Sequence, residues 1–273
     1  AARQRDAALD LGEEALLLEG FCAASAHAAL AAAPADAALA GGYVRSLLRD
    51  LEADGLAASE PAGPRVLAAP DLPAALGIWR QALLEQPALA PDLAWLALAA
   101  ERLPGVLAGE RPAEGDPSTA GPPPESAALD RLAAVLAEAA AAAVAAWPRG
   151  RPLRVLEIGA GAGPLTARIA AALGATGLQV LLHAAALPGG RGGPPRLPPD
   201  TPATVELLPS VWDPLGPDAS PVPADLVVGL AAGAAMRAGD ALPSALRHAM
   251  APGGALLLVE PLPGRVWDFC CGQ

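Results

Sequence analysis

The sequence contains no lysine, so each of its 18 basic residues is an arginine, set against 29 acidic residues. The net charge is −11, and no basic cluster interrupts this acidic balance. An acidic surface repels phosphate groups, which argues against nucleic acid or an anionic membrane as a partner. Aromatic residues are also scarce, at 3% of a chain that is 53% hydrophobic, so alanine and leucine must fill the core.

Only three cysteines are present, Cys22 and the adjacent pair Cys270 and Cys271, and they have neither the spacing of a metal site nor that of a disulfide framework. This usage fits a reducing compartment, and we expect a cytoplasmic protein without a metal site. We find no signal peptide and no membrane span: the longest apolar run, residues 132–147, is mostly alanine and is interrupted by a glutamate. Because the chain begins without methionine and stops abruptly, we expect it to be a piece of a longer polypeptide.

The most informative stretch is residues 151–170, RPLRVLEIGAGAGPLTARIA. Its segment Leu153–Ile158 is a short apolar run, typical of a strand buried on both faces of a sheet. Three glycines follow at alternate positions, Gly159, Gly161 and Gly163, and the proline after them suits the first turn of a helix. A strand, a glycine turn and a helix predict the first crossover of a doubly wound parallel sheet. Glycines there allow a ligand to approach the main-chain N–H groups at the helix start.

The 273 residues suffice for one large domain or two smaller ones, and the pattern of the chain favours two. Helical periodicity covers residues 1–34, 43–55, 76–85 and 91–103. Residues 56–58 and 65–68 flank a Pro/Gly turn and predict a small β-hairpin, while residues 110–126 have the composition of a linker. We therefore predict a helical domain over residues 1–125 and an α/β domain over residues 126–273.

The second domain alternates strands with helices. Strands are predicted over residues 153–158, 178–182, 204–208, 225–230 and 255–260. Helices are predicted over residues 127–147, capped by Ser126, and over residues 166–173 and 241–250, the last followed by a turn at 251–254. Residues 187–203 are a Pro/Gly-rich loop. Parallel strands joined in this way give a doubly wound sheet with right-handed crossovers.

Three segments resemble known methyltransferases. The segment LEIGAGAG, with Glu157 ahead of its glycines, resembles motif I of class I S-adenosylmethionine (SAM) methyltransferases, whereas a dinucleotide fingerprint would need glycine at position 164, which is proline. Residues 91–110, PDLAWLALAAERLPGVLAGE, resemble the helical lid of polyketide-synthase C-methyltransferase domains. The pair ADLVVGL and MAPGGALLLVE resembles the fourth and fifth strands of that family.

The resemblance runs from about Tyr43 to the C-terminus. It implies the class I SAM-methyltransferase (Rossmann-like) fold, preceded by a mainly helical lid. The last two strands of that fold have no counterpart, either because the domain is shorter or because residues beyond it are missing from this piece. The resemblance also implies SAM as the cofactor, with Glu157, Gly159, Gly161 and Gly163 as its binding residues.

Several other site residues of that family are changed in this sequence. The ribose-binding acid after the second strand falls on Ala184, and the general-base histidine after the fourth strand falls on Ala234. A base must titrate near neutral pH, as histidine does, and no replacement is visible. Glu260 is a vestigial candidate for the glutamate that orients the base. After the third strand, Asp213 is a doubtful substitute for the adenine-binding acid, and Trp212 either stacks on adenine or, as we favour, packs in the core.

We therefore interpret the chain as a catalytically inactive pseudo-methyltransferase domain of a modular polyketide synthase, with a structural role. It would bind SAM weakly or not at all, and its partners would be the reducing domains and the acyl carrier protein of the same polypeptide. An alternative, favoured by the intact glycine turn, is an active SAM-dependent C- or O-methyltransferase acting on a carrier-bound polyketide intermediate. A third hypothesis, a winged-helix regulator, depends only on the hairpin, and the acidic charge argues against it.

Overall fold

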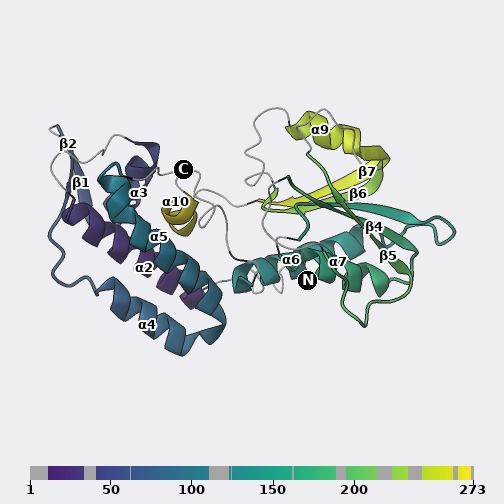
Figure 1. Ribbon diagram of the computed structural model, residues 1–273, viewed down its shortest axis with the longest axis horizontal. Coiled ribbons are helices and arrows are strands. Elements are labelled where there is room, and N and C mark those ends of the chain that lie inside the picture. The colour runs from purple at the N-terminus through teal and green to yellow at the C-terminus, as the bar shows by residue number, and fades with distance from the viewer. Residues whose placement is uncertain are drawn as a thin grey trace. The chain divides into compact units, whose positions relative to one another are not determined.

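The computed structural model of the chain describes residues 12–33, 41–61, 63–110, 123, 125–161, 163–188, 195–213, 223–232, 242–260 and 264–271. They fall into two compact units. The core unit contains residues 124–261 and the large sheet, and the helical unit joins residues 10–123 to residues 262–273 (Figure 1).

The helical unit consists of helices and one small hairpin. Its helices are α2 (Gly12–Ala31), α3 (Gly42–Ala53), α4 (Ala75–Glu85), the 3-10 turn η1 (Pro87–Leu89), α5 (Ala90–Leu107) and α10 (Arg265–Cys271). In α3 the buried apolar residues Tyr43, Val44, Leu47, Leu48 and Leu51 recur every three or four positions, so they form one stripe that faces the core. Two strands, β1 (Ala57–Glu60) and β2 (Gly63–Val66), pair antiparallel and confirm the predicted hairpin.

The helix α10 belongs to the helical unit although it follows the last strand of the core unit in the sequence. It packs against α2, α3 and α5, and Phe269 is fully buried there. The sequence analysis assigned residues 262–273 to the α/β domain because they follow its last strand. That assignment is corrected, because the apolar partners of α10 lie more than 150 residues earlier in the chain.

By length and composition, α2 contains a stretch, residues 14–31, that could cross a membrane, near the N-terminus. Core helices of soluble proteins pass the same test. In this structure α2 buries Phe21, Cys22 and Ala26 in the core of the helical unit, and it packs against α4, α5 and α10.

The core unit contains a five-stranded parallel sheet of order β5-β4-β3-β6-β7 among the described residues. Its strands are β3 (Leu153–Ile158), β4 (Val180–Ala186), β5 (Val205–Val211), β6 (Ala224–Leu230) and β7 (Met250–Val259). Residue Leu156 of the central strand pairs with His183 of β4 on one side and with Val227 of β6 on the other. The predicted strands are thereby confirmed, and the order is that of a doubly wound sheet.

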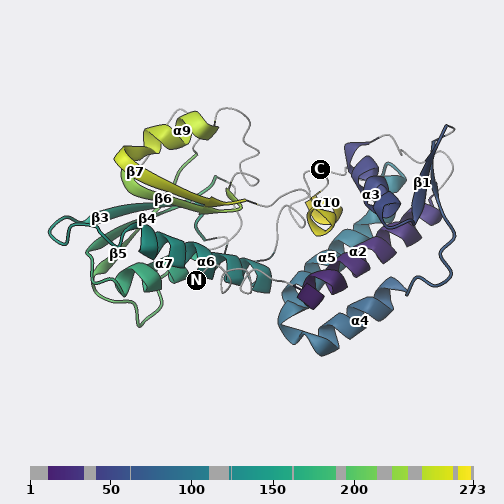
Figure 2. The same cartoon turned by 180° about the vertical axis from the view of Figure 1, so that it is seen from behind.

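Helices cover both faces of this sheet, as Figures 1 and 2 show from opposite sides. The helices α6 (Ala127–Ala143) and α7 (Leu165–Gly174) cover one face, where Leu153 and Val155 of β3 point. The helix α9 (Leu242–Ala249) covers the other face, where Leu156 and Ile158 point. Residues of a strand alternate between faces, so Glu157 shares the face of α6 and α7.

The start of α6 is confirmed, whereas the predicted turn before the last strand is wrong. Ser126 caps α6 as predicted, since its hydroxyl accepts a hydrogen bond from the Leu129 N–H at 3.2 Å. The predicted turn at residues 251–254 lies inside β7 instead: the pairing passes from Ala224 with Met250 to Leu226 with Ala255, so these residues bulge from the strand. Residues 1–11, 111–122 and 189–194, which belong to the predicted first helix, linker and Pro/Gly loop, lie outside the described residues.

Candidate functional site

The candidate site is the carboxyl edge of the sheet, where β3 runs into the glycine turn. Gly159 and Gly161 have φ angles of +80° and +85°, which side-chain-bearing residues rarely adopt, so the turn requires glycine at both places. The N–H groups of Gly159 and Ala160 both donate to the carbonyl oxygen of Ala185, at 2.9 and 3.0 Å. These two donors attach the turn to the end of β4, and α7 follows directly. The predicted strand, glycine turn and helix are confirmed.

Glu157 lies in β3, two residues before the turn, and its side chain faces α7. Its Oε1 accepts a hydrogen bond from Thr166 Oγ1 at 2.9 Å, while Oε2 is buried without a hydrogen-bond partner among the described residues. Burial raises the pKa of Glu157 to about 7, and the bond from Thr166 opposes this rise. Only 2% of Glu157 is exposed, so the carboxyl group is enclosed between the strand and the helix.

The carboxyl end of β4 offers no carboxylate that could bind the hydroxyl groups of a ribose. Ala184 pairs with Glu157 across the two strands, and Ala184 and Ala185 are both fully buried. From residue 158 to residue 199 the sequence contains no aspartate or glutamate. The histidine of this strand, His183, pairs with Leu156 and so lies on the face opposite to Glu157. Burial, helped by the charge of Arg154, lowers the pKa of His183, so its imidazole is neutral at pH 7.

At the end of β5, Trp212 packs in the core. Its indole is buried in the apolar cluster with Ile158, Ala185 and Leu246. The backbone N–H of Trp212 donates to the carbonyl oxygen of Ala186 at 3.0 Å. This is the role we favoured for Trp212 over stacking on adenine. Asp213, the next residue, is exposed.

The ends of β6 and β7 contain the positions at which the family resemblance implies catalytic groups. Ala231 follows β6 with a φ of +53°, and its N–H donates to the carbonyl oxygen of Val259 at 2.7 Å. Ala234, the place of the implied histidine, lies outside the described residues. Glu260 follows β7 and is half-buried. Because parallel strands end at the same edge, Glu260 and the glycine turn share the carboxyl edge of the sheet.

The strongest polar cluster of the sheet lies at its opposite, amino edge. Asp225 accepts hydrogen bonds from the N–H of Arg154 at 3.0 Å and from the guanidinium of the same residue at 2.9 and 3.0 Å. Arg151 donates to the same carboxylate and stacks on the Trp147 ring at 4.4 Å. Burial alone would raise the pKa of Asp225, but the bonds and charges of the two arginines lower it. Sequence analysis missed this cluster of Arg151, Arg154 and Asp225, although the two arginines at the start of β3 and the aspartate at the start of β6 were available signals.

No described residue at the carboxyl edge offers an imidazole base. His27 Nε2 contacts the carbonyl oxygen of Leu67 at 2.8 Å in the helical unit, and His248 Nδ1 contacts that of Ser244 at 2.7 Å on α9. His183, the third histidine, is within β4. Over the described parts of the chain, no group of three or more His, Cys, Asp and Glu residues could hold a metal ion.

The parallel sheet, with a glycine turn after its central strand and helices on both faces, defines a class I methyltransferase fold. The solved structure of the citrinin polyketide synthase CMeT domain has this fold, with a TM-score of 0.67 and 16% sequence identity over 96% of this chain and 76% of that one. The CurJ carbon methyltransferase matches with a TM-score of 0.66 and 19% identity, over 99% of this chain and 81% of that one.

A third solved structure, the DszA carbon methyltransferase, has a TM-score of 0.66 and 18% identity, over 97% of this chain and 76% of that one. No protein-family model and no curated protein sequence matches the chain. At these identities the structural likeness concerns the fold. It confirms the predicted resemblance to the C-methyltransferase domains of polyketide synthases at that level.

Proposed function

We propose that this chain is a catalytically inactive, methyltransferase-like domain of a modular polyketide synthase, and that its role is structural. The observation that carries the proposal is a preserved fold whose described residues at the carboxyl edge offer no carboxylate after β4 and no imidazole. The glycine turn is intact, yet the neighbouring strand ends in buried alanines.

The energetic argument concerns the ribose of SAM. In the family that this chain resembles, a carboxylate accepts hydrogen bonds from both ribose hydroxyls. Each charge-assisted bond of this kind contributes about 1.5–3 kcal/mol, so its loss weakens binding by one to two orders of magnitude. Here the enclosed Glu157 is bonded to Thr166. The resemblance gives Glu260 the task of orienting a histidine, and the position of that histidine is occupied by Ala234 in this sequence.

Calorimetric titration of the purified chain with SAM tests the proposal. We expect no binding tighter than about 100 μM, which corresponds to about −5.5 kcal/mol. The matched control is Gly161→Val, which cannot adopt the φ of +85° that the turn requires. Binding below 100 μM that this substitution abolishes would contradict the proposal, because it would be specific to the glycine turn.

The alternative is an active SAM-dependent C- or O-methyltransferase that acts on a carrier-bound polyketide intermediate. It is supported by the retained glycine turn and by the fold shared with three carbon methyltransferases. It requires methyl transfer from SAM to a β-ketoacyl or β-hydroxyacyl thioester, detectable by mass spectrometry as a gain of one methylene mass. If neither thioester gives this product, the alternative function is excluded.

We further propose that the domain works in the cytoplasm beside the reducing domains and the acyl carrier protein of its own polypeptide, without binding nucleic acid or membrane. The hairpin that prompted the winged-helix hypothesis is present, but its arginine, Arg65, is paired with Glu60 at 2.7 Å. Co-purification of the chain with its neighbouring domains, and failure to bind duplex DNA, are the expected results.

A further inference from the structure

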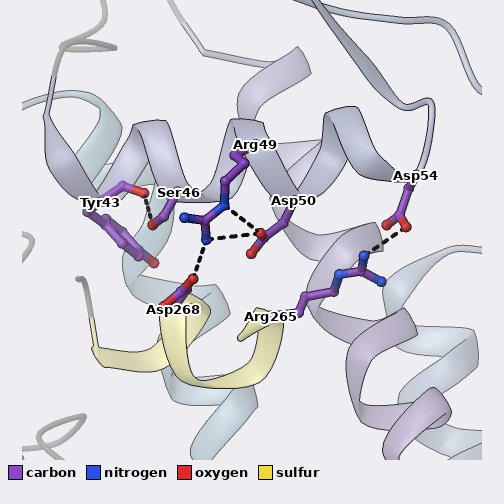
Figure 3. Close-up of polar contacts among 7 residues, drawn as sticks. All are labelled: Tyr43, Ser46, Arg49, Asp50, Asp54, Arg265 and Asp268. Carbon is purple, nitrogen blue, oxygen red and sulfur yellow. Dashed lines mark hydrogen bonds and ion pairs between the residues drawn. The ribbon is translucent and has the colours of Figure 1, made fainter. Parts of the chain in front are cut away.

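The helix α10 is held on the helical unit by residues that lie more than 200 positions away in the sequence. Figure 3 shows the polar contacts of α10, in which side chains of α3 meet side chains of α10. Tyr43 Oη donates to the carbonyl oxygen of Phe269 at 2.8 Å. This bond fixes the last turn of α10 against the start of α3.

An apolar anchor lies beside that bond. The Phe269 ring is fully buried and meets the ring of Phe21 edge to face, with centroids 6.5 Å apart and planes at 80°. Two thiols are buried in the same cluster: Cys22 on α2 and Cys270 on α10, each at 2% exposure or less. Removal of α10 would therefore uncover Phe21 and Cys22.

Ion pairs of Asp268 and Arg265 orient the helix from its sides. Arg49 of α3 donates to Asp268 at 2.6 Å; the side chain of Asp268 is 2% exposed, whereas that of Arg49 is 61% exposed. Arg265 bonds to Asp54 at 2.8 Å and lies 3.8 Å from Glu19. Asp268 thus depends on Arg49, while Arg49 keeps most of its contact with water. The loss of Arg49 leaves a buried charge without its partner, which is the more costly way to break such a pair.

Packing beneath α10 is incomplete. A small pocket remains between α2, α3 and α10, lined in part by Cys22, Asp50, Leu51, Arg265 and Phe269. Two polar atoms in this region, Asp50 Oδ2 and Arg265 Nε, are buried without hydrogen-bond partners among the described residues. An interface with a gap and with unsatisfied polar atoms holds α10 less firmly than a close-packed core would.

We propose that α10 is a detachable helix, which docks on and undocks from α2, α3 and α5 as one element while the rest of the chain stays folded. Only residues 260–264 separate it from β7, whose end lies at the edge of the sheet that carries the glycine turn. This proposal does not depend on whether the domain binds SAM.

The test measures how fast the buried thiols react with a maleimide, in a Cys271→Ser background so that Cys22 and Cys270 are the reporters. Arg49→Leu should speed the labelling of both thiols by at least about tenfold, because the buried Asp268 loses its partner. The matched control is Arg65→Leu, which breaks the exposed ion pair with Glu60 in the same unit and should leave labelling unchanged. Asp268→Asn, which removes the buried charge itself, should have a smaller effect than Arg49→Leu.

Hydrogen exchange measured by mass spectrometry separates undocking from general unfolding. In Arg49→Leu the amides of α10 and the facing side of α3 should lose protection, while those of β3, β4 and β6 keep it. A chain that ends at residue 263 should expose Cys22 and retain the same protected strands. Equal labelling rates in Arg49→Leu and Arg65→Leu would overturn the proposal, and so would loss of protection in the sheet together with α10.

Discussion

Thr166 Oγ1 donates to Glu157 Oε1 across 2.9 Å, and this bond connects the central strand of the sheet to the first turn of α7. The glycine turn lies between the two residues. The carboxyl group that the resemblance assigns to SAM binding is enclosed, with one oxygen bonded to Thr166 and the other without a partner among the described residues. The bond stabilises the turn from within the protein, which fits a fold retained for its shape.

The enclosed Glu157 predicts a specific dependence of stability on pH. Its pKa rises from an ordinary 4.5 to about 7 on folding, so the folded state binds the proton more tightly than the unfolded state. Its contribution is fully present below pH 4.5 and is lost as the pH rises to 7, by about 3 kcal/mol. Glu157→Gln removes this loss, so the variant should gain stability relative to the wild type at pH 8 and not at pH 4.5.

Urea unfolding of the core unit, followed by pulsed hydrogen exchange of β3 and α7, measures this difference. The matched control is Glu206→Gln, a change of an exposed glutamate on β5. Parallel pH profiles for Glu157→Gln and the wild type would show that the carboxyl group of Glu157 is ionised in the folded state with an ordinary pKa.

The cluster of Asp225, Arg151 and Arg154 at the amino edge of the sheet predicts the opposite dependence of stability on pH. The arginines lower the pKa of Asp225, so its contribution to stability is present above an ordinary value of 3.8 and is lost as the pH falls through the lowered value. Asp225→Asn should destabilise the core unit at pH 7 by about 1–3 kcal/mol, since it weakens several bonds to a buried carboxylate.

The control for this cluster is Asp130→Asn, which breaks the exposed ion pair with Arg168 and should cost less than about 1 kcal/mol. Both variants are compared by urea unfolding at pH 7 and at a pH well below 3.8, where the contribution of Asp225 should be lost. If the two substitutions lower the free energy of unfolding equally, the Asp225 cluster contributes no more to stability than a surface ion pair does.

The bulge in β7 predicts different costs at two adjacent glycines. A Cβ on Gly254 would lie 2.9 Å from the carbonyl oxygen of Ala251 and 3.0 Å from that of Ala224, both backbone atoms that cannot swing away. Gly254→Ala should therefore cost about 1–3 kcal/mol through overpacking. Gly253 has open space but a φ of +78°, so Gly253→Ala should cost roughly 1–2 kcal/mol through backbone strain alone.

Thermal unfolding of the alanine variants checks this prediction, with Gly150→Ala as control. A Cβ on Gly150 would meet no atom within 4 Å beyond its chain neighbours, and its φ is not positive, so the substitution should change stability by less than about 0.5 kcal/mol. A harmless Gly254→Ala would mean that residues 251–254 form a free turn, as the sequence suggested, and not a bulge packed on β6.

Local patterns explain what the sequence predicted well. The stripe of α3, the hairpin and the strand Leu153–Ile158 depend on neighbouring residues only, and each is found where it was expected. The missing acid at the end of β4 could also be read directly from the chain. The packing of α10 on the helical unit could not be predicted in this way, because Tyr43 and Phe269 lie 226 positions apart and no local pattern connects them.

The candidate site shows the same division. Glu157 and the glycines at 159 and 161 were placed correctly at the end of the central strand. The hydrogen bond to Thr166 and the enclosure of the carboxyl group depend on how α7 packs on the sheet, which spacing alone does not give. Whether Glu157 binds SAM remains a prediction from the resemblance.

The most direct test of the central claim is the titration of this chain with SAM, alongside Gly161→Val. An inactive, structural domain predicts no heat of binding up to a SAM concentration of several times 100 μM, and no difference between the two proteins. Saturable binding below 100 μM in the wild type, lost in Gly161→Val, would show a working cofactor site at the glycine turn and would contradict the account.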